Sequence, residues 1–266
     1  MQKMTDIINN ADIDAAGGAY PTAAAAAECP VCGGSGYILK PDGTAGRCSC
    51  FRRRQMLIAQ KAARLQPVLR QMSFKNFDLS CYPAGEPAPG GKGETYYALA
   101  AQARDKAEAI CTSVCRGGNP RGLLLMGQVG SGKTHLAAAI ANRLLSRGHR
   151  VLFLVVPDFL DELRNSFSGF NEESTGSLLE AAKHTEVLIL DDLGGHNLTD
   201  WTKSVLFSIL NFRVNEGLTT IATSNLDIAS LPELLGTRSM SRLLSLCEPC
   251  LLISPADLRL RGLEKS

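Results

Sequence analysis

The chain has 266 residues, 45% of them hydrophobic, which is enough for one substantial α/β core and a small additional module. Its 28 basic and 26 acidic residues give a net charge of +2, which excludes a protein that attracts nucleic acid through bulk charge alone. No apolar run approaches the roughly 20 residues of a membrane helix, and the polar N-terminus has no secretory pattern. We therefore expect a cytoplasmic protein without membrane contact, whose nine cysteines are thiols or metal ligands.

The N-terminal part of the chain is predicted to contain three successive segments. Residues 1–28 end in the small, unpatterned run ADIDAAGGAYPTAAAAAE, which predicts a flexible leader. A cysteine cluster follows at 29–50, and residues 51–73 have apolar side chains at helical spacing, so we assign them as a helical linker. Pro67 should kink or restart this helix, and the Pro- and Gly-rich run at 82–94 predicts a loop.

The cysteine cluster has the spacing of a zinc module. Cys29 and Cys32 are followed by fifteen residues and then by Cys48 and Cys50, and the intervening PDG suits a hairpin turn. Four thiolates brought together by a hairpin suit tetrahedral Zn²⁺, and so small a module would have little core without a metal. Because the second pair is spaced C-x-C rather than C-x-x-C, unliganded structural cysteines are the alternative.

Strand-like and helix-like segments alternate in the remainder of the chain. Short apolar strands are predicted at 122–127, 151–156, 187–192, 219–225 and 250–254, with helical stretches between them. Such continuous apolar runs are typical of parallel strands buried on both faces. The expected fold class is therefore α/β, with a parallel sheet flanked by helices and preceded by the small N-terminal zinc-binding module.

A glycine-rich run between the first of these strands and the next helix has the form of a phosphate-binding loop. The residues predicted to contact a bound nucleotide are Gly127, Gln128, Val129, Gly130, Ser131, Gly132, Lys133, Thr134 and His135. Backbone N–H groups at the helix N-terminus hold the phosphates, Lys133 reaches the terminal phosphate, and Thr134 ligates Mg²⁺. A structural turn is the alternative, but the strand and helix flanks favour ATP or GTP.

Polar residues follow two of the predicted strands. VLILDD places Asp191 at the carboxyl edge of the sheet, where ligands bind in open α/β folds. We predict that Asp191 holds Mg²⁺ and that Asp192 orients or deprotonates the attacking water. Asn225 would position this water against the γ-phosphate. For the paired acids, a solvated turn is the alternative interpretation.

The order of these motifs carries a family resemblance. MGQVGSGKTHLAAAIANRLL, VLILDDLG, TDWTKSVLFSILNFR, TIATSNL, RSMSRL and DLR together closely resemble DnaC/DnaI-type helicase loaders and their IstB-like relatives in the AAA+ ATPase superfamily. The resemblance covers about residues 74–262 and implies a P-loop AAA+ ATPase core, which we assign to 74–266. It further implies that Arg242, flanked by Arg238, is the arginine finger given to a neighbouring subunit, and that Arg259 is the second sensor arginine. Many AAA+ ATPases have glutamate where this chain has Asp192, which suits slow hydrolysis stimulated by assembly or DNA.

The resemblance also implies partners. These are a hexameric replicative helicase docked by the zinc module, single-stranded DNA, and further copies of the chain in an ATP-dependent or partner-templated oligomer. Composition does not show DNA binding. FRRRQ at 51–55 could bind phosphates, but a solvated helix face is the favoured interpretation. Arg164 with Phe167 and Phe170 could stack on bases, and core packing is an equal alternative for Phe167. The leading function is an ATP-dependent helicase loader. An IstB-like transposition helper that remodels DNA for a transposase is the alternative, favoured less because of the zinc module, and a P-loop kinase fits poorly with TSN and SRL.

Overall fold

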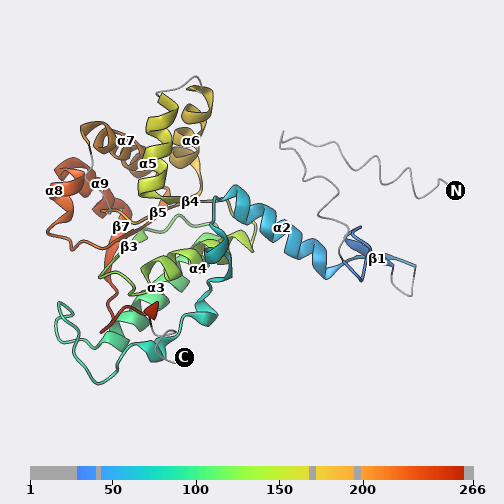
Figure 1. The fold of residues 1–266 in the computed structure, drawn as a ribbon, viewed down its shortest axis with the longest axis horizontal. Helices are drawn as coiled ribbons and strands as arrows, with labels where there is room; N and C mark the ends of the chain where they lie inside the picture. The colour runs from blue at the N-terminus through green and yellow to red at the C-terminus, as the bar shows by residue number, and fades with distance from the viewer. Residues whose placement is uncertain (1–28, 40–42, 168–171, 195–198, 261–266) are drawn as a thin grey trace. The chain divides into compact units, whose positions relative to one another are not determined.

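The computed structural model describes residues 29–39, 43–167, 172–194 and 199–260, so the predicted leader lies outside the described residues (Figure 1). The chain forms two compact units, Met1–Gln55 and Met56–Ser266, and helix α2 (Ser49–Ala62) crosses the division between them. None of the helices in the described part of the chain has the length and apolar character needed to cross a membrane.

The larger unit is built on a five-stranded parallel sheet. Its strands are β3 (Gly122–Met126), β4 (Val151–Val155), β5 (Val187–Asp191), β6 (Thr219–Ser224) and β7 (Cys247–Leu251), in the order β4-β5-β6-β3-β7. The strands pair in parallel throughout, with the buried runs of β3, β5 and β6 at the centre. This arrangement confirms the predicted α/β fold class.

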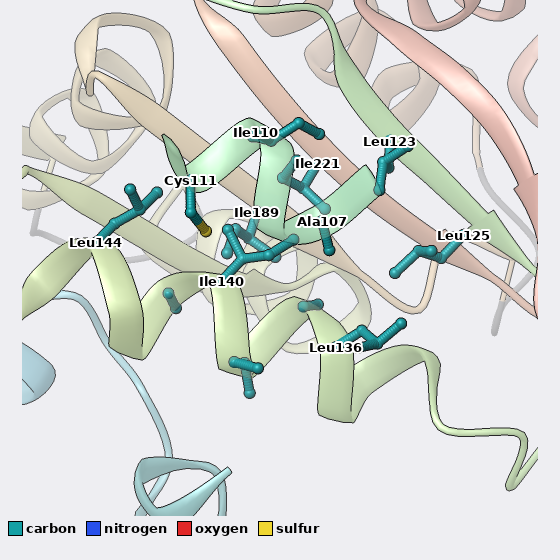
Figure 2. Packing of buried hydrophobic residues seen from close by; sticks show 14 of the residues in the cluster. Ala107, Ile110, Cys111, Leu123, Leu125, Leu136, Ile140, Leu144, Ile189 and Ile221 are labelled. Carbon is teal, nitrogen blue, oxygen red and sulfur yellow. The ribbon is translucent and has the colours of Figure 1, made fainter. Parts of the chain in front are cut away.

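Helices cover both faces of the sheet (Figure 1). One face carries α3 (Tyr96–Cys115) and α4 (Lys133–Leu145); the other carries α5 (Val156–Phe167), α6 (Glu172–His184), α7 (Asp200–Glu216), α8 (Leu231–Leu235) and α9 (Thr237–Leu246). Figure 2 shows Ile140 and Leu144 of α4 facing Ile189 of the sheet. The alternate strand residues, such as Leu188, point to the opposite cluster, which explains why each strand is apolar along its whole length.

The last strand differs from its prediction. The apolar run 250–254 was expected to be the strand, but β7 is Cys247–Leu251, and Leu252 to Ser254 are buried without being part of it. Glu248 and Pro249 interrupt the apolar run, so the sequence pattern does not predict a strand at these positions. Proline is tolerated here because β7 is an edge strand that pairs with β3 alone among the described strands, so one side of its backbone needs no ladder.

The end of α2 and the following lead-in segment, residues 63–82, pack against α4 and the edge strand β4. The Ala63 carbonyl accepts a hydrogen bond of 2.9 Å from the Phe153 N–H, which covers the exposed edge of β4. The helix α2 ends at Ala62, and Pro67 begins a separate 3₁₀ turn, η2 (Pro67–Gln71), which is the predicted restart. Leu65 and Leu69, which we placed in the helical linker, are buried in the core cluster of the larger unit.

A buried amide ties this segment to α4. Asn142 Nδ2 donates to the carbonyls of Leu69 at 2.9 Å and Met72 at 2.8 Å, and its Oδ1 accepts from Gln60 Nε2 at 2.7 Å. Each of these polar groups therefore has a partner in a region with little water, as burial requires. The lead-in segment is consequently held beside the helix that begins at the phosphate loop.

Arg213 of α7 is fully buried, although arginine is rarely found inside proteins. Its guanidinium donates to the carbonyls of Ala182, Lys183 and Thr185 at the end of α6, and to the Thr219 carbonyl at 2.6 Å. A cation beside the last carbonyls of a helix also complements the helix dipole. Burial lowers the pKa of Arg213 to about 9, so the side chain stays charged at neutral pH and joins α6, α7 and β6.

The smaller unit contains an antiparallel hairpin of β1 (Tyr37–Leu39) and β2 (Ala45–Arg47), followed by the start of α2. Most of the predicted PDG turn lies at 40–42, outside the described residues. Phe51 of α2 packs against the Tyr37 ring at a centroid distance of 5.6 Å and lies under the Arg47 guanidinium. The hairpin and the helix together bring the two cysteine pairs close to each other.

Candidate functional site

The phosphate loop connects β3 to α4 and is packed from two sides. Gly130 and Gly132 both have left-handed backbone conformations, with φ of 75° and 94°. A Cβ at Gly130 would lie 1.9 Å from Asp257 Oδ1, and one at Gly132 would lie 2.6 Å from the Tyr82 hydroxyl oxygen. Only glycine satisfies both the backbone angle and this close packing, which leaves the loop N–H groups uncovered by side chains of the loop.

Lys133 begins α4 and is only 6% exposed. Its Nζ donates to the carbonyls of Gly127 at 2.8 Å and Gln128 at 2.7 Å, and burial lowers its pKa to about 8 although Asp191 opposes the shift. The buried Ser131 hydroxyl has no hydrogen-bond partner among the described residues. An ammonium group and an unpartnered hydroxyl beside a helix N-terminus fit the phosphates of a nucleotide.

Asp191 ends β5, and its carboxylate lies within hydrogen-bond distance of α4, the helix that follows the phosphate loop. Its carboxylate accepts from Thr134 Oγ1 at 3.0 Å and from Thr223 Oγ1 at 2.7 Å. Burial raises the pKa of Asp191, and the two hydroxyl donors counteract this shift by stabilising the carboxylate. The predicted magnesium ligands, Thr134 and Asp191, are thus adjacent, and their hydroxyl and carboxylate oxygens are the donor set that Mg²⁺ prefers.

Asp192 has a φ of 62°, a left-handed conformation that is uncommon for a residue with a side chain. Its N–H donates to Thr223 Oγ1 at 2.9 Å, and its Oδ1 accepts from Asn225 Nδ2 at 2.9 Å. The predicted pair of Asp192 and Asn225 is therefore in direct contact. Strained backbone held by its surroundings is a feature that clusters at active sites.

A cavity of about 910 Å³ brings most of the predicted site residues together. It is lined by five of the six residues predicted to be catalytic, Lys133, Asp191, Asp192, Asn225 and Arg259, and by Val129, Gly130, Gly132, Thr134 and His135 of the loop. A volume in this range accommodates a ligand of nucleotide size.

Arg259 reaches the cavity from the loop that follows β7. Leu258 N–H donates to the Gly130 carbonyl at 3.1 Å, and Gln128 Nε2 donates to the Ser254 carbonyl. The segment between β7 and Arg259 therefore lies across the phosphate loop. The sequence could not show this, because the two segments are about 130 residues apart.

The lead-in segment forms a wall of the cavity that the sequence did not predict. Its lining residues are Gln66, Val68, Leu69, Met72, Asn76, Phe77, Asp78, Cys81 and Tyr82. The Tyr82 hydroxyl donates to the Ser131 carbonyl at 2.8 Å, and His135 Nε2 lies 3.0 Å from the Ser73 carbonyl. The motif SFKNFDLSCYP was the available signal, but the partners of its Tyr82 and Ser73 lie 49 and 62 residues further along the chain.

Arg242 is the one predicted catalytic residue outside this cavity. It lies half-buried on α9 and lines a second hollow of about 540 Å³ with Phe207, Thr237, Arg238 and Ser241. Within the described part of the chain, no hydrogen bond or ion pair involves its guanidinium. The side chain is therefore available to another molecule and does not line its own chain's cavity.

The four cysteines of the smaller unit converge as the spacing predicted, with all four sulfur atoms within 4.8 Å of one another. Cys29 Sγ lies 3.8 Å from Cys48 Sγ, and Cys32 Sγ lies 3.3 Å from Cys50 Sγ. Tetrahedral zinc with bonds of about 2.3 Å requires sulfur separations of about 3.8 Å. The donor set therefore fits zinc.

Hydrogen bonds favour a negative charge on Cys32, whereas burial, with hydrogen bonds to Cys32 and Cys48, raises the pKa of Cys50 to about 12. The Gly36 N–H donates to Cys32 Sγ at 3.3 Å, and Arg54 donates to Cys50 Sγ at 3.1 Å. Burial raises the pKa of Cys32, but hydrogen bonds from the Cys50 thiol and from the Gly36 and Gly34 N–H groups outweigh it and bring the pKa to about 6. Thiolate is the form that binds metal.

We predict that each chain binds one zinc ion and that Cys29→Ser reduces the bound zinc severely, because it removes one of four ligands. Metal analysis of protein purified without added zinc measures this directly. Cys115→Ser, which changes an exposed cysteine of the larger unit, is the matched control and should retain the metal. ATP binding should survive in Cys29→Ser because the cluster and the cavity lie in different units. Zinc-free wild-type protein would contradict the prediction.

Comparisons with known proteins agree on one family. The model for IstB-like ATP-binding proteins matches residues 89–247. The replicative helicase loader DnaI of Bacillus subtilis strain 168 is 37% identical over 109 residues, which are 41% of this chain and 34% of that protein. The replicative helicase loader DnaC of Escherichia coli strain K12 is 28% identical over 181 residues, 67% of this chain and 65% of that protein.

A solved structure supports the same relationship. The crystal structure of DnaI superposes with a TM-score of 0.57 at 30% sequence identity and covers 73% of this chain and 94% of that one. The region matched by the family model, residues 89–247, contains the phosphate loop, Asp191, Asp192 and Asn225, which meet in the cavity. The chain therefore belongs to the family of IstB-like ATP-binding proteins and is similar to its DnaC/DnaI-type members.

Proposed function

We propose that the protein is an ATP-dependent loader of a replicative DNA helicase onto single-stranded DNA, in which ATP binding and hydrolysis act as a switch. The observation that carries the proposal is the cavity in which the phosphate loop, the Thr134–Asp191 pair and the strained Asp192–Asn225 pair meet. The relatives described as replicative helicase loaders supply the biological context.

In this proposal the phosphate loop and Lys133 bind the triphosphate. Arg259 contacts the bound nucleotide from the segment that follows β7. Thr134 and Asp191 hold Mg²⁺, which neutralises phosphate charge during transfer. Asp192 orients the attacking water or accepts its proton, and Asn225, whose amide donates to the Asp192 carboxylate, positions the same water against the γ-phosphate. The aspartate side chain is one methylene shorter than glutamate, which suits slow turnover.

The proposed partners follow from the same role. The zinc module binds the hexameric helicase, the larger unit contacts single-stranded DNA, and ATP or the helicase assembles several chains, all in the cytoplasm. For DNA, Arg52 and Arg53 are exposed and available, whereas Arg54 is engaged with Cys50. Of the proposed stacking group, Arg164 is exposed, while Phe170 and the side chain of Phe167 lie outside the described residues.

A transposition helper is the second candidate, because the family model is that of the IstB-like proteins. Such a helper would remodel duplex DNA for a transposase. The four converging thiols favour the loader, since a separate metal module suits docking to another protein.

The test is to incubate the protein with the cognate hexameric replicative helicase, ATP and closed circular single-stranded DNA. We expect a complex of protein and helicase on gel filtration and transfer of the helicase to the circle, which has no end to thread. Lys133→Ala should fail to complete loading. Absence of a helicase complex, together with ATP-dependent binding to duplex DNA and stimulation of a transposase, would instead establish the second candidate.

A further inference from the structure

Thr223 has no role in the chemistry described so far, yet it lies between the two acidic residues of the site. It occupies the second last position of the central strand β6, is 1% exposed and lines the nucleotide cavity. A buried threonine must find partners for its hydroxyl, and those partners define its role.

The hydroxyl group joins Asp191 to Asp192. It donates its one proton to Asp191 Oδ1 at 2.7 Å and accepts the Asp192 N–H at 2.9 Å. The first bond orients a side chain, and the second holds a backbone in its left-handed conformation. The Thr223 side chain therefore contacts both acidic residues: it orients the Asp191 carboxylate and holds the Asp192 backbone.

The hydrogen bond from Thr223 to Asp191 differs in kind from the one that Thr134 makes. Thr134 Oγ1 also donates to Asp191, but in the proposed function the oxygen of this hydroxyl binds Mg²⁺ as well, so its position is set by the metal. Among the described residues, Thr223 is the side-chain donor to Asp191 that is not itself a proposed magnesium ligand. Donors of this kind around a metal site orient the ligands and tune metal affinity.

The backbone around Thr223 supports the same turn. The Thr223 carbonyl accepts the Leu193 N–H at 2.8 Å, so residues 191–193 are paired with β6 through both backbone and side chain. A substitution that removes only the hydroxyl leaves the backbone bond in place. Such a substitution therefore tests the orientation of the two acidic residues without removing the backbone bond that supports the turn.

We propose that Thr223 is a positioning residue that sets the Asp191 carboxylate for Mg²⁺ and holds Asp192 in its strained conformation. The inference rests on the proposed ATPase function. It predicts that the Thr223 hydroxyl determines how strongly Mg²⁺ promotes ATP binding, without affecting the contacts that the phosphate loop makes with metal-free ATP.

The experiment measures ATP affinity in Mg²⁺ and in EDTA for the wild type, Thr223→Val and Thr223→Ser. In Thr223→Val, the gain in affinity due to Mg²⁺ should fall by about 10-fold or more, while affinity in EDTA stays at the wild-type value. Thr223→Ser keeps the hydroxyl and should restore the gain. Hydrolysis should follow the same order, with a higher Mg²⁺ requirement in the valine variant.

Thr219→Val is the matched control. Thr219 lies on the same strand, is buried, and donates its hydroxyl to the Pro120 carbonyl at 2.9 Å, away from the cavity. Thr219→Val also loses a side-chain hydrogen bond on β6, but not one to the acidic residues, so it should keep the wild-type response to Mg²⁺. Circular dichroism monitors folding; if Thr223→Val does not fold, the pair Thr223→Ala and Thr223→Ser gives the same comparison of hydroxyl against none.

Two failures can be distinguished. The role of Thr223 is overturned if Mg²⁺ increases the ATP affinity of Thr223→Val as much as that of the wild type. It is also overturned if Thr219→Val loses this increase as well. Either result leaves the ATPase proposal standing. A wild type that does not bind ATP at all, with or without Mg²⁺, overturns the proposed function itself.

Discussion

Arg242→Ala should bind ATP almost as tightly as the wild type yet lose hydrolysis by about 10³-fold. Phosphoryl transfer builds charge on the γ-phosphate oxygens, and an arginine from a neighbouring subunit stabilises that charge. Arg242 fits such a role because it lines the hollow on α9 and is absent from the lining of its own chain's cavity. Nucleotide titration and phosphate release measure the two properties separately, and Arg147→Ala, which changes an exposed arginine after α4, should behave as the wild type.

A mixture of two inactive variants tests whether Arg242 acts across an interface. Arg242→Ala retains an intact nucleotide cavity, and Lys133→Ala retains an intact Arg242. If the arginine acts on a neighbour, combining them should recover part of the hydrolysis, and wild-type activity per chain should rise with protein concentration. Normal hydrolysis by Arg242→Ala alone, or an inactive mixture of chains that demonstrably associate, would require the finger assignment to be withdrawn.

Lys133→Ala should abolish measurable ATP binding while the protein remains folded. The substitution removes the buried ammonium group that lies among the loop carbonyls and is available to the phosphates. Titration with a nucleotide measures the loss, and circular dichroism measures folding. Undiminished affinity would refute the assignment of the loop as a phosphate site.

Two further variants separate charge from packing at this position. Lys133→Met keeps the apolar stem of the buried side chain, so it should also lose ATP binding and should fold at least as well as the alanine variant. Lys75→Ala removes an exposed lysine of the lead-in segment and should bind ATP normally. Loss of binding in Lys75→Ala as well would point to a general effect of charge rather than to the loop.

Features that depend on neighbouring residues could be predicted from the sequence. The five apolar runs predicted a parallel sheet because burial on both faces leaves no room for polar alternation, and four of the five strands lie where expected. The phosphate loop was recognisable because its glycine, lysine and threonine residues lie within one short segment of the sequence. The Asp191–Asp192 pair was also predictable, since a carboxylate that follows a buried strand lies at the carboxyl edge of the sheet.

Contacts between distant segments could be known only from the folded chain. It showed β7 to be an edge strand that accommodates Pro249, and it placed the lead-in segment against the phosphate loop through Tyr82. It also gave Thr223 two acidic neighbours that are more than 30 residues away along the chain. Spacing and periodicity report the local backbone, whereas the partner of a buried hydroxyl is set by which strands adjoin in the sheet, and that adjacency is a property of the folded chain alone.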